Sequence, residues 1–446
     1  MNSIARTTLE RLRRYESQNV TFMEPDGSWP IVWDKAQGVH VWDPAGKRYL
    51  DLTAAFGVAA AGHANPRVVK AGQRQMSKLL HAMGDVHPHA LKATLAGELS
   101  RITFERWSLS APSSRAAHRT SLIKGKTIFC NSGFEAVEAA LKTALLATGK
   151  SGIIAFHGAY HGLGYGALNV THRDHFRSPF RAQLGEFGHF VLFPSQSAQL
   201  DDVEKAVKKL FRQKQVGAIL VEPIQARGGI NIPPPGFLPL VRKLCDQFEA
   251  LLILDEIYTG FGRTGKWFAC EHDQTVPDLI CLGKAITGGF PLSACVGRGE
   301  VMDRAWPRST GEAIHTSTYL GHPVGCAMAL AQIEEIRERK LVARSASLGR
   351  EFLQELQALE NSSHLQFMAR GIGLMSGLEL RFLNGEPAAE ITLRVVKAML
   401  HRGYILLPEG ENANVIGFTP PLTISERQLR HMLRNLNEVL ADRRLA

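Results

Sequence analysis

The chain has 446 residues, of which 45% are hydrophobic and 21% charged, a composition typical of a globular protein with a large buried core. The formal net charge is +10, but the basic residues are spread among acidic ones, a pattern that argues against nucleic-acid binding and at most favours small anions. No apolar run approaches the roughly 18 residues of a membrane span and no signal-peptide pattern is seen, so we expect a cytoplasmic protein without a membrane partner.

The six cysteines form no recognisable metal or redox motif. None belongs to a C-x-x-C pair, and most lie in apolar stretches typical of strands or helices. We expect all six to be reduced residues of the core. They are Cys130, Cys245, Cys270, Cys281, Cys295 and Cys326.

The first 60 residues predict a short amphipathic helix followed by several short strands. The strands are expected in residues 30–52, where the turn Asp43-Pro44-Ala45-Gly46 separates two alternating apolar runs. We assign residues 1–60 to a smaller domain.

Residues 127 to 300 alternate between apolar runs of strand length and helical segments. Strands are expected at "KTIFC", "GIIAF", "GAILVE", "ALLILD", "DLICLG" and "LSACVG", with helices near 133–148, 201–214 and 238–249. This alternation predicts a parallel sheet covered by helices on both faces. We assign residues 61–325 to this large domain.

The last part of the chain begins with a long helical stretch after residue 325 and ends with a helix from about 425. Strands and one helix are expected between them. We assign residues 326–446 to the smaller domain, which both ends of the chain therefore build. The predicted fold class is α/β, with a large central domain that has a mostly parallel sheet covered by helices, and a smaller α/β domain from both termini.

Ligands of a parallel sheet collect at the carboxyl ends of its strands, so the residues after each strand are candidates for a site. Ser132-Gly133-Phe134-Glu135 follows "KTIFC" and forms an S-x-x-E capping box. The free N–H groups of such a helix start suit a phosphate. Taken alone, however, the motif is better explained as a simple helix cap.

The segment His157-Gly158-Ala159-Tyr160-His161 follows "GIIAF". Its two histidines suggest a metal pair, but the glycines argue against a helix and no third ligand is in range, so we expect no metal. Tyr160 suits either stacking against a flat ring or ordinary packing.

Three charged residues also follow apolar strands. Glu222 ends "GAILVE" and is either hydrogen-bonded for structural reasons or part of a site. Asp255 follows "ALLIL" and needs a cation or hydrogen-bond donors. Lys284 follows "DLICLG" and becomes a nucleophile near neutral pH if it is desolvated, although most lysines lie at the surface.

These strand-end groups point to one cofactor when they are considered together. Pyridoxal 5′-phosphate needs an anion nest for its phosphate, a residue that stacks on its ring, an acid against its pyridine nitrogen and a Schiff-base lysine. The helix start at Ser132, the loop at Tyr160, Asp255 and Lys284 supply these four groups. None of the four is specific by itself.

The stretch "LLILDEIYTGFGRTG" supports a competing hypothesis, because residues 260–265 match the G-x-G-x-x-G of dinucleotide-binding folds. That fold predicts a helix directly after Gly265. The sequence there, "KWFACEHDQTVPD", has no sustained helical period. We therefore assign the chemistry to Asp255 rather than to the glycines.

From about Val39 to Leu422 the sequence resembles the class III aminotransferases, fold-type I pyridoxal-phosphate enzymes that include ω-amino-acid and ornithine aminotransferases. The motifs that carry the resemblance are, in order, "NSGFEAVEAALK", "AYHG", "VEPIQ", "DEIYTGFGRTG", "PDLICLGKAITGGFPLSACVG", "HTSTYLGHP", "RGIGL" and "PPLTIS". Each motif alone is weak, but all of them in this order are highly specific.

The resemblance implies a role for each matching residue. Lys284 matches the lysine that carries the cofactor as a Schiff base, and Asp255 matches the acid at the pyridine nitrogen. Ile257 and Tyr160 would pack on the two ring faces. Thr318 matches a threonine that reaches the phosphate of the neighbouring subunit, which implies a homodimer with shared active sites. The full set expected at the cofactor is Ser132, Gly133, Phe134, Tyr160, His161, Glu222, Asp255, Ile257, Tyr258, Lys284 and Thr318.

Several positions depart from the family's pattern. Tyr258 stands where many members have a glutamine near the cofactor's ring oxygen. Arg370 matches an arginine that often binds the substrate's α-carboxylate, but Arg227 replaces the glutamate that pairs with it in many members. Either both arginines favour an anionic substrate group, or Arg227 points outward and Arg370 pairs elsewhere. Phe56, expected to contact substrate, is followed by Gly57, and this pair stands where the amine–pyruvate branch carries a large aromatic after an apolar residue, which implies a roomier pocket here.

The activity that the resemblance implies is ping-pong transamination from an amine or ω-amino acid to a 2-oxo acid. Lys284 would take the proton from the donor carbon and deliver it to the cofactor's aldehyde carbon, while Asp255 keeps the pyridine nitrogen protonated. Aminomutases and amino-acid racemases of the same fold use the same residues and are the alternative. A requirement for an added oxo acid distinguishes the two.

Overall fold

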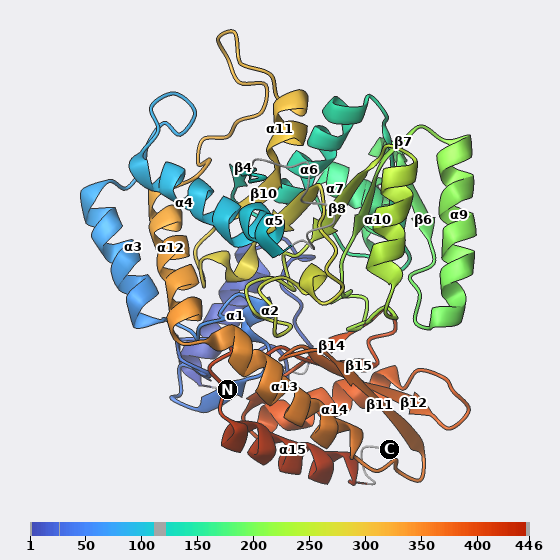
Figure 1. Ribbon diagram of the computed structural model, residues 1–446. Coiled ribbons are helices and arrows are strands. Elements are labelled where there is room, and N and C mark those ends of the chain that lie inside the picture. Colours follow the sequence, from blue (N-terminus) through green and yellow to red (C-terminus); the bar gives the residue numbers. More distant parts are fainter. Residues whose placement is uncertain (1, 26, 111–121, 443–446) are drawn as a thin grey trace.

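The centre of the computed structural model, which describes residues 2–25, 27–110 and 122–442, is a seven-stranded sheet of order β4-β10-β9-β8-β7-β5-β6 (Figure 1). Every strand except β6 lies where the sequence predicts one. The strands are β4 (Gly125–Cys130), β5 (Gly152–Phe156), β6 (Gly188–Val191), β7 (Val216–Val221), β8 (Leu251–Asp255), β9 (Leu279–Leu282) and β10 (Ser293–Arg298).

Strand β10 is antiparallel to both of its neighbours, and the other strands of the sheet run in one direction, so the sheet is mostly parallel, as predicted. The segment between Leu282 and Ser293 is too short to hold the crossover helix that a parallel connection requires. Because β4 and β9 both pair antiparallel with β10, they run in the same direction. The carboxyl ends of β4, β5, β7, β8 and β9 therefore meet at one edge of the sheet.

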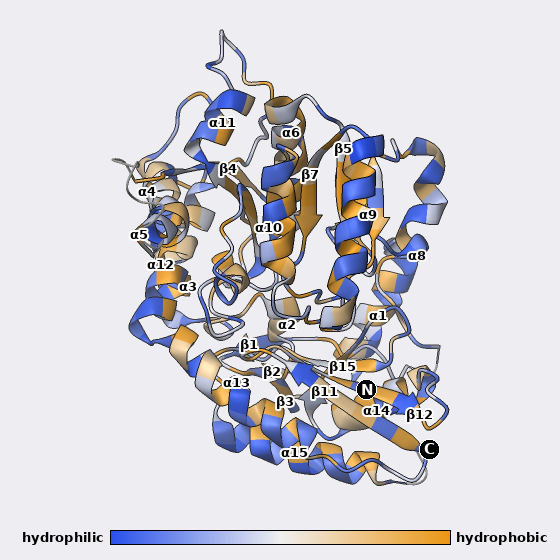
Figure 2. Ribbon diagram, turned by 45° about the vertical axis from the view of Figure 1, so that its right-hand side comes forward, coloured by the Kyte–Doolittle hydropathy of each residue, from blue (hydrophilic) through white to orange (hydrophobic). Residues whose placement is uncertain are grey.

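Helices cover both faces of this sheet, as the sequence predicts. Ile154 of β5 belongs to one core cluster with residues of α9 and α10, whereas the next residue, Ala155, belongs to a second cluster with residues of α6. Figure 2 shows apolar strands (orange) behind α9 and α10, whose ribbons carry many hydrophilic residues (blue). The three helices are α6 (Gly133–Thr148), α9 (Leu200–Gln213) and α10 (Phe237–Gln247).

Two smaller sheets lie beside the central one, in the lower half of Figure 1. One has the order β11-β12-β15-β14. In the other, β1-β2-β3-β13, the pairing of β3 with β13 joins the two ends of the chain. The strands are β1 (Lys35–Gln37), β2 (His40–Trp42), β3 (Arg48–Asp51), β11 (Leu365–Gly371), β12 (Ser376–Phe382), β13 (Tyr404–Ile405), β14 (Leu407–Glu409) and β15 (Val415–Phe418).

The remaining long helices include both predicted and unpredicted elements. The long helical stretch expected after residue 325 is two helices, α12 and α13, because Lys340 adopts a left-handed conformation between them (φ 52°). The helices are α1 (Ser3–Tyr15), α3 (Pro66–Lys78), α4 (Ala90–Ser100), α12 (Pro323–Glu338), α13 (Leu341–Gln357), α14 (Ala389–His401) and α15 (Glu426–Leu440). Within the described ranges, no helix is both long and apolar enough to cross a membrane.

The glycine-rich segment 260–265 is a buried loop and not the start of a helix. Arg263 is 2% exposed, and its guanidinium donates hydrogen bonds to the carbonyls of Leu374 and Pro420. A Cβ on Gly265 would lie 2.8 Å from Ala346. The next helical turn is a short 3-10 segment further along the chain, so the loop does not form a dinucleotide-binding turn.

The six cysteines are free and buried, which confirms the expectation of reduced core residues.

Candidate active site

Lys284 follows β9 at the sheet edge where the five strand ends meet. Its backbone is strained, with a φ of 42°, and its Nζ lies 3.7 Å from the centre of the Tyr258 ring. Burial lowers the pKa of Lys284 to about 8, against the opposing charges of Asp255, Glu222 and Glu409. An appreciable fraction of the amine is therefore neutral, and hence nucleophilic, near neutral pH.

The two adjacent acids after β8 have different surroundings. Asp255 Oδ2 lies 2.8 Å from His161 Nδ1, and Asp255 Oδ1 accepts a hydrogen bond from the Ile257 N–H. Glu256 instead accepts hydrogen bonds from the loop 259–270, through one hydroxyl and two backbone N–H groups. Glu256 thus stabilises a loop, whereas Asp255 is oriented by the loop that carries His161.

Glu222 joins the loops that follow β5 and β7. Its two carboxylate oxygens accept hydrogen bonds from the N–H groups of Tyr160 (3.0 Å) and Ala226 (3.2 Å). Burial raises the pKa of Glu222 to about 7, and its charge acts on Lys284. Both roles that the sequence left open for Glu222 are therefore compatible, since it is hydrogen-bonded and also borders the site.

The start of α6 offers hydrogen-bond donors at the same edge. The Glu135 side chain accepts from the Ser132 N–H (3.1 Å), but the buried Ser132 Oγ has no hydrogen-bond partner among the described residues. A Cβ on Gly133 would lie 3.1 Å from Ile257, so the backbone approaches the β8 loop closely. Phe134 packs beside this helix start and is 38% exposed.

This arrangement fits pyridoxal phosphate. The unpaired Ser132 hydroxyl and the free N–H groups of α6 would hold the phosphate. Asp255 would meet the ring nitrogen and Lys284 the aldehyde carbon. His161 Nε2 is also buried without a partner among the described residues, which leaves a polar atom for a bound group.

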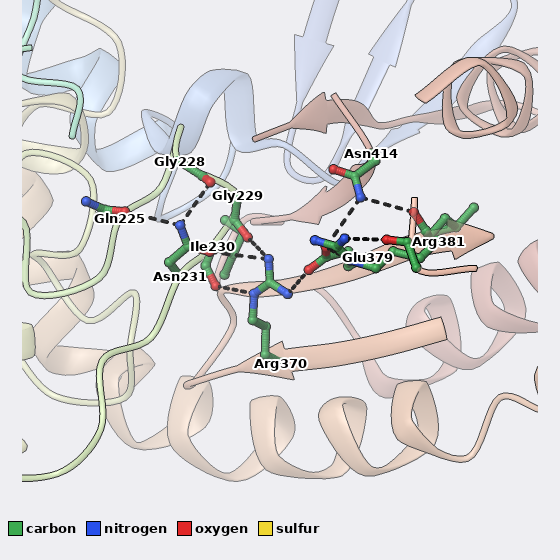
Figure 3. Close-up of polar contacts among 11 residues, drawn as sticks. Gln225, Gly228, Gly229, Ile230, Asn231, Arg370, Glu379, Arg381 and Asn414 are labelled. Atoms are coloured by element: carbon green, nitrogen blue, oxygen red, sulfur yellow. Dashed lines mark hydrogen bonds and ion pairs between the residues drawn. The ribbon is translucent and has the colours of Figure 1, made fainter. Parts of the chain in front are cut away.

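Arg370 is held in a hydrogen-bond network with Glu379 and the carbonyls of Gly229 and Ile230 (Figure 3). Its guanidinium donates to the two carbonyls and pairs with Glu379 at 2.5 Å. Burial opposes ionisation of Glu379, but the hydrogen bonds and charges of Arg370 and Arg381 lower the pKa of that carboxyl. Arg370 pairs elsewhere, as in the second alternative left open by the sequence, whereas Arg227 contacts Glu409 and lies near the Tyr160 ring rather than pointing outward.

Arg227 is closer to the Lys284 site and is partly exposed. Its Nη1 lies 3.5 Å from Glu409 Oε2, and its guanidinium lies 5.9 Å from the centre of the Tyr160 ring. Glu409 is not among the site residues predicted from the sequence. A signal was present, because Glu409 ends the apolar run "YILLP" as Asp255 ends "ALLIL".

Phe56 and Thr318 lie nearer the surface. Residues 54–56 form a left-handed turn, and Phe56 is 49% exposed. The turn borders the site, because a Cβ on Gly57 would lie 3.0 Å from the Tyr258 ring. Thr318 is exposed on the segment that precedes α12.

The histidines of the H-x-x-x-H pattern make other contacts. His157 stacks on His172, and His161 lies against Asp255. Across the described ranges, no group of three His, Cys, Asp or Glu side chains is arranged to hold a metal ion.

Comparison with known sequences gives consistent matches over nearly the whole chain. Residues 22–440 match the family model described as "Aminotransferase class-III". The chain is 36% identical to an acetylornithine aminotransferase of Methanosarcina mazei, over 91% of each chain. It is also 36% identical to a 5-aminovalerate aminotransferase of Pseudomonas aeruginosa, over 92% of this chain and 93% of the relative.

Solved structures match the fold over similar lengths. An ornithine aminotransferase from Toxoplasma gondii superposes with a TM-score of 0.81 at 26% identity, covering 98% of this chain and 94% of the other. An amine transaminase from an uncultivated Pseudomonas species, solved with pyridoxal phosphate bound, gives a TM-score of 0.84 at 26% identity over 96% of this chain and 98% of the other.

The lowered pKa of Lys284 predicts how the cofactor-free protein reacts with pyridoxal phosphate. The pKa is about 8. Below that pH, the amount of neutral amine rises roughly tenfold with each unit increase in pH, and well above it nearly all of the amine is neutral. We expect the rate of covalent loading, measured by borohydride trapping, to rise and then level off near pH 8. A rate that keeps rising steeply beyond about pH 9, as for an ordinary lysine, would contradict the burial of this amine.

Proposed function

The chain belongs to the class-III aminotransferase family, and from this premise we propose that Lys284, Asp255 and Arg227 carry out the transfer of an amino group from an amine or ω-amino acid to a 2-oxo acid. The observation that carries the proposal is the buried Lys284 amine, whose pKa responds to Asp255. Pyridoxal phosphate, when bound, supplies an electrophilic carbon and a ring that accepts electrons.

Lys284 is proposed as the group that moves the proton. In its neutral form, Nζ accepts a proton from the donor carbon and afterwards donates it. The pKa of about 8 supports this role, because an amine close to the working pH both accepts and releases protons readily. The strained backbone at Lys284 fixes the point from which the side chain extends.

Asp255 is proposed to keep a proton on the ring nitrogen of the cofactor. Its carboxylate is held at one oxygen by the Ile257 N–H and at the other by His161. An acid anchored on both sides does not swing away to pair with Lys284. That rigidity supports a fixed role at the nitrogen.

Arg227 is proposed to receive a carboxylate of the donor or acceptor. The side chain keeps 32% of its surface exposed and its ion pair with Glu409 is long, at 3.5 Å, so the guanidinium retains donors for a further acceptor. Arg370 is proposed to have a structural role, because its nitrogens already serve two carbonyls and Glu379.

A homodimer with shared sites is proposed from an exposed apolar patch around Thr318. The two segments of the patch lie side by side, since the His81 and Tyr319 rings are 5.5 Å apart and the Thr316 hydroxyl donates to Asp85. An exposed patch of this kind marks an interface. Its exposed apolar side chains are Met76, Leu79, Leu80, Met83, Val86, Ile314 and Tyr319.

A cytoplasmic location is proposed on the basis of the cysteines. All six are free and buried, which suits a reducing compartment.

The proposed transfer predicts that Lys284→Ala loses steady-state turnover by at least about a thousandfold, because both the nucleophile and the proton carrier are removed. Amino transfer from 4-aminobutanoate to pyruvate measures the loss, and cofactor absorbance confirms loading. Wild-type turnover must require the oxo acid. Full turnover by the variant, or turnover without an oxo acid as in a mutase or racemase, would refute the proposal.

The two arginines predict different defects. Arg227→Gln should lower kcat/KM for 4-aminobutanoate by about tenfold or more, since a charge-assisted hydrogen bond is lost, and should leave butylamine nearly unchanged. Arg370→Gln should instead lower the melting temperature, because it leaves Glu379 and two carbonyls under-paired. Kinetics with both donors and thermal unfolding separate the two. The reverse pattern would assign carboxylate binding to Arg370.

The proposed dimer predicts a mass near twice the 49.1 kDa of one chain by light scattering. Leu80→Arg should raise the dimer dissociation constant by about tenfold or more, because a charge then opposes an apolar partner surface, and activity should fall on dilution. Leu383→Arg is the matched control, since Leu383 is similarly exposed but lies outside the patch. A monomeric wild-type protein with full activity would exclude shared sites.

A further inference from the structure

Glu409 is a buried carboxylate that the proposed transfer leaves without a role. It ends β14 and is 6% exposed. Its Cγ lies where a side chain at position 417 would project, since a Cβ on Gly417 would come within 3.0 Å of it. The absence of a side chain at Gly417 therefore provides the space that Glu409 occupies.

The carboxylate of Glu409 is not saturated by hydrogen bonds. Oε2 has no hydrogen-bond partner among the described residues, and the nearest cation, Arg227 Nη1, lies 3.5 Å away. The backbone fixes this separation in part, because the Gly410 N–H donates to the Arg227 carbonyl. A buried oxygen left in this way is costly unless another donor completes it.

Glu379 is a second buried glutamate, and its carboxylate is fully hydrogen-bonded. Glu379 accepts hydrogen bonds from Arg370 at 2.5 Å and from Arg381 at 2.6 Å, and the pKa of its carboxyl is lowered despite burial (Figure 3). For Glu409, burial raises the pKa to about 7, and Arg227 and Lys284 only partly offset that rise. The two glutamates pair with the same residue type but differ in the donors they receive.

Glu409 is linked to the loops around Lys284 through Arg227, whose guanidinium pairs with Glu409 and lies 5.9 Å from the centre of the Tyr160 ring. The charge of Glu409 raises the pKa of Lys284, and the charge of Lys284 lowers the pKa of Glu409. Burial and the charge of Glu409 also raise the pKa of Tyr258, whose ring centre lies 3.7 Å from Lys284 Nζ. A donor amine that reacts at the cofactor carbon beside Lys284 would therefore extend its remaining atoms towards this incompletely paired carboxylate.

We propose that Glu409 is a specificity-determining residue that receives a second ammonium group on the donor, so that the preferred donor is a diamine or a diamino acid. This inference rests on the proposed amino transfer. An ammonium has three N–H donors and would donate to Glu409 Oε2 the charge-assisted hydrogen bond that this oxygen lacks. In a diamino acid, Arg227 would take the carboxylate while Glu409 takes the ammonium.

Arg227 does not remove the need for this cation. It is 32% exposed, so water satisfies part of its guanidinium, whereas Glu409 is buried. Glu409 is therefore the member of the pair that lacks a hydrogen-bond partner. This favours a cationic group on the donor over a second anionic one.

The test compares three donors of matched length in the holoenzyme, with pyruvate as acceptor: 1,4-diaminobutane, butylamine and 4-aminobutanoate. We expect wild type to prefer the diamine over butylamine by about tenfold or more in kcat/KM, as one charge-assisted hydrogen bond allows. Glu409→Gln should abolish that preference and change butylamine less than about twofold. Glu411 is an exposed glutamate in the loop that follows β14, and Glu411→Gln should behave as wild type.

Several outcomes overturn the inference. They are an equal loss for the diamine and butylamine in Glu409→Gln, which would indicate a structural role, or a wild type without a diamine preference. If Glu409→Gln does not fold, Glu409→Asp is tested instead. This variant keeps the charge and should retain part of the preference for the diamine over butylamine. Turnover of 4-aminobutanoate checks the proposed transfer separately, because that donor lacks the second ammonium.

A fourth donor, 2,5-diaminopentanoate, distinguishes a diamino acid from a diamine as the preferred donor. Arg227→Gln should lower kcat/KM for this diamino acid and spare 1,4-diaminobutane, whereas Glu409→Gln should lower both. Calorimetric binding of N,N,N′,N′-tetramethyl-1,4-diaminobutane, which cannot react at the aldehyde carbon, gives a readout independent of turnover. Its affinity should fall about tenfold in Glu409→Gln, and an unchanged affinity would contradict the inference.

Discussion

The removal of charged side chains from water at the carboxyl edge of the central sheet is the constraint on which the site depends. Lys284, Glu222 and Asp255 follow or end neighbouring strands, so the parallel direction of β7, β8 and β9 brings their charges together. Burial favours the neutral amine of Lys284, and the surrounding carboxylates favour the charged one. The balance leaves a pKa of about 8, at which one amine serves as nucleophile and as proton carrier.

The same edge also concentrates backbone strain. Residues 54–56 and Lys284 adopt left-handed conformations without being glycine, each at a cost on the order of 1–3 kcal/mol. Such residues persist only where their surroundings fix them. Asp51 does so for the turn, because it accepts hydrogen bonds from the N–H groups of Thr53 and Ala55 and lies 2.7 Å from His63. The strained backbone is thus anchored in the small sheet that both chain ends build.

Local sequence was sufficient to predict the groups that follow strands but not the contacts between distant segments. Apolar runs indicated six of the seven central strands, and the polar residues after them included Lys284, Asp255 and Glu222. The antiparallel direction of β10 depends on the short connection from β9, which strand periodicity does not report. The pairing of Arg370 with Glu379 arises from the pairing of β11 with β12. The position of Glu409 beside Arg227 arises from the contact of the end of β14 with the loop after β7. No local motif encodes that packing.

The two arginine–glutamate pairs show why residue type alone does not assign a function. Arg370 and Glu379 meet with short hydrogen bonds, and two backbone carbonyls complete the arginine, so the pair has little capacity left for a ligand. Arg227 and Glu409 lie farther apart, and Glu409 Oε2 lacks a hydrogen bond within the described residues. A substrate binds most favourably where the protein leaves donors and acceptors incompletely paired. The number of partners that each charged group already has, more than its position in a motif, therefore separates the structural pair from the one that is available to a donor.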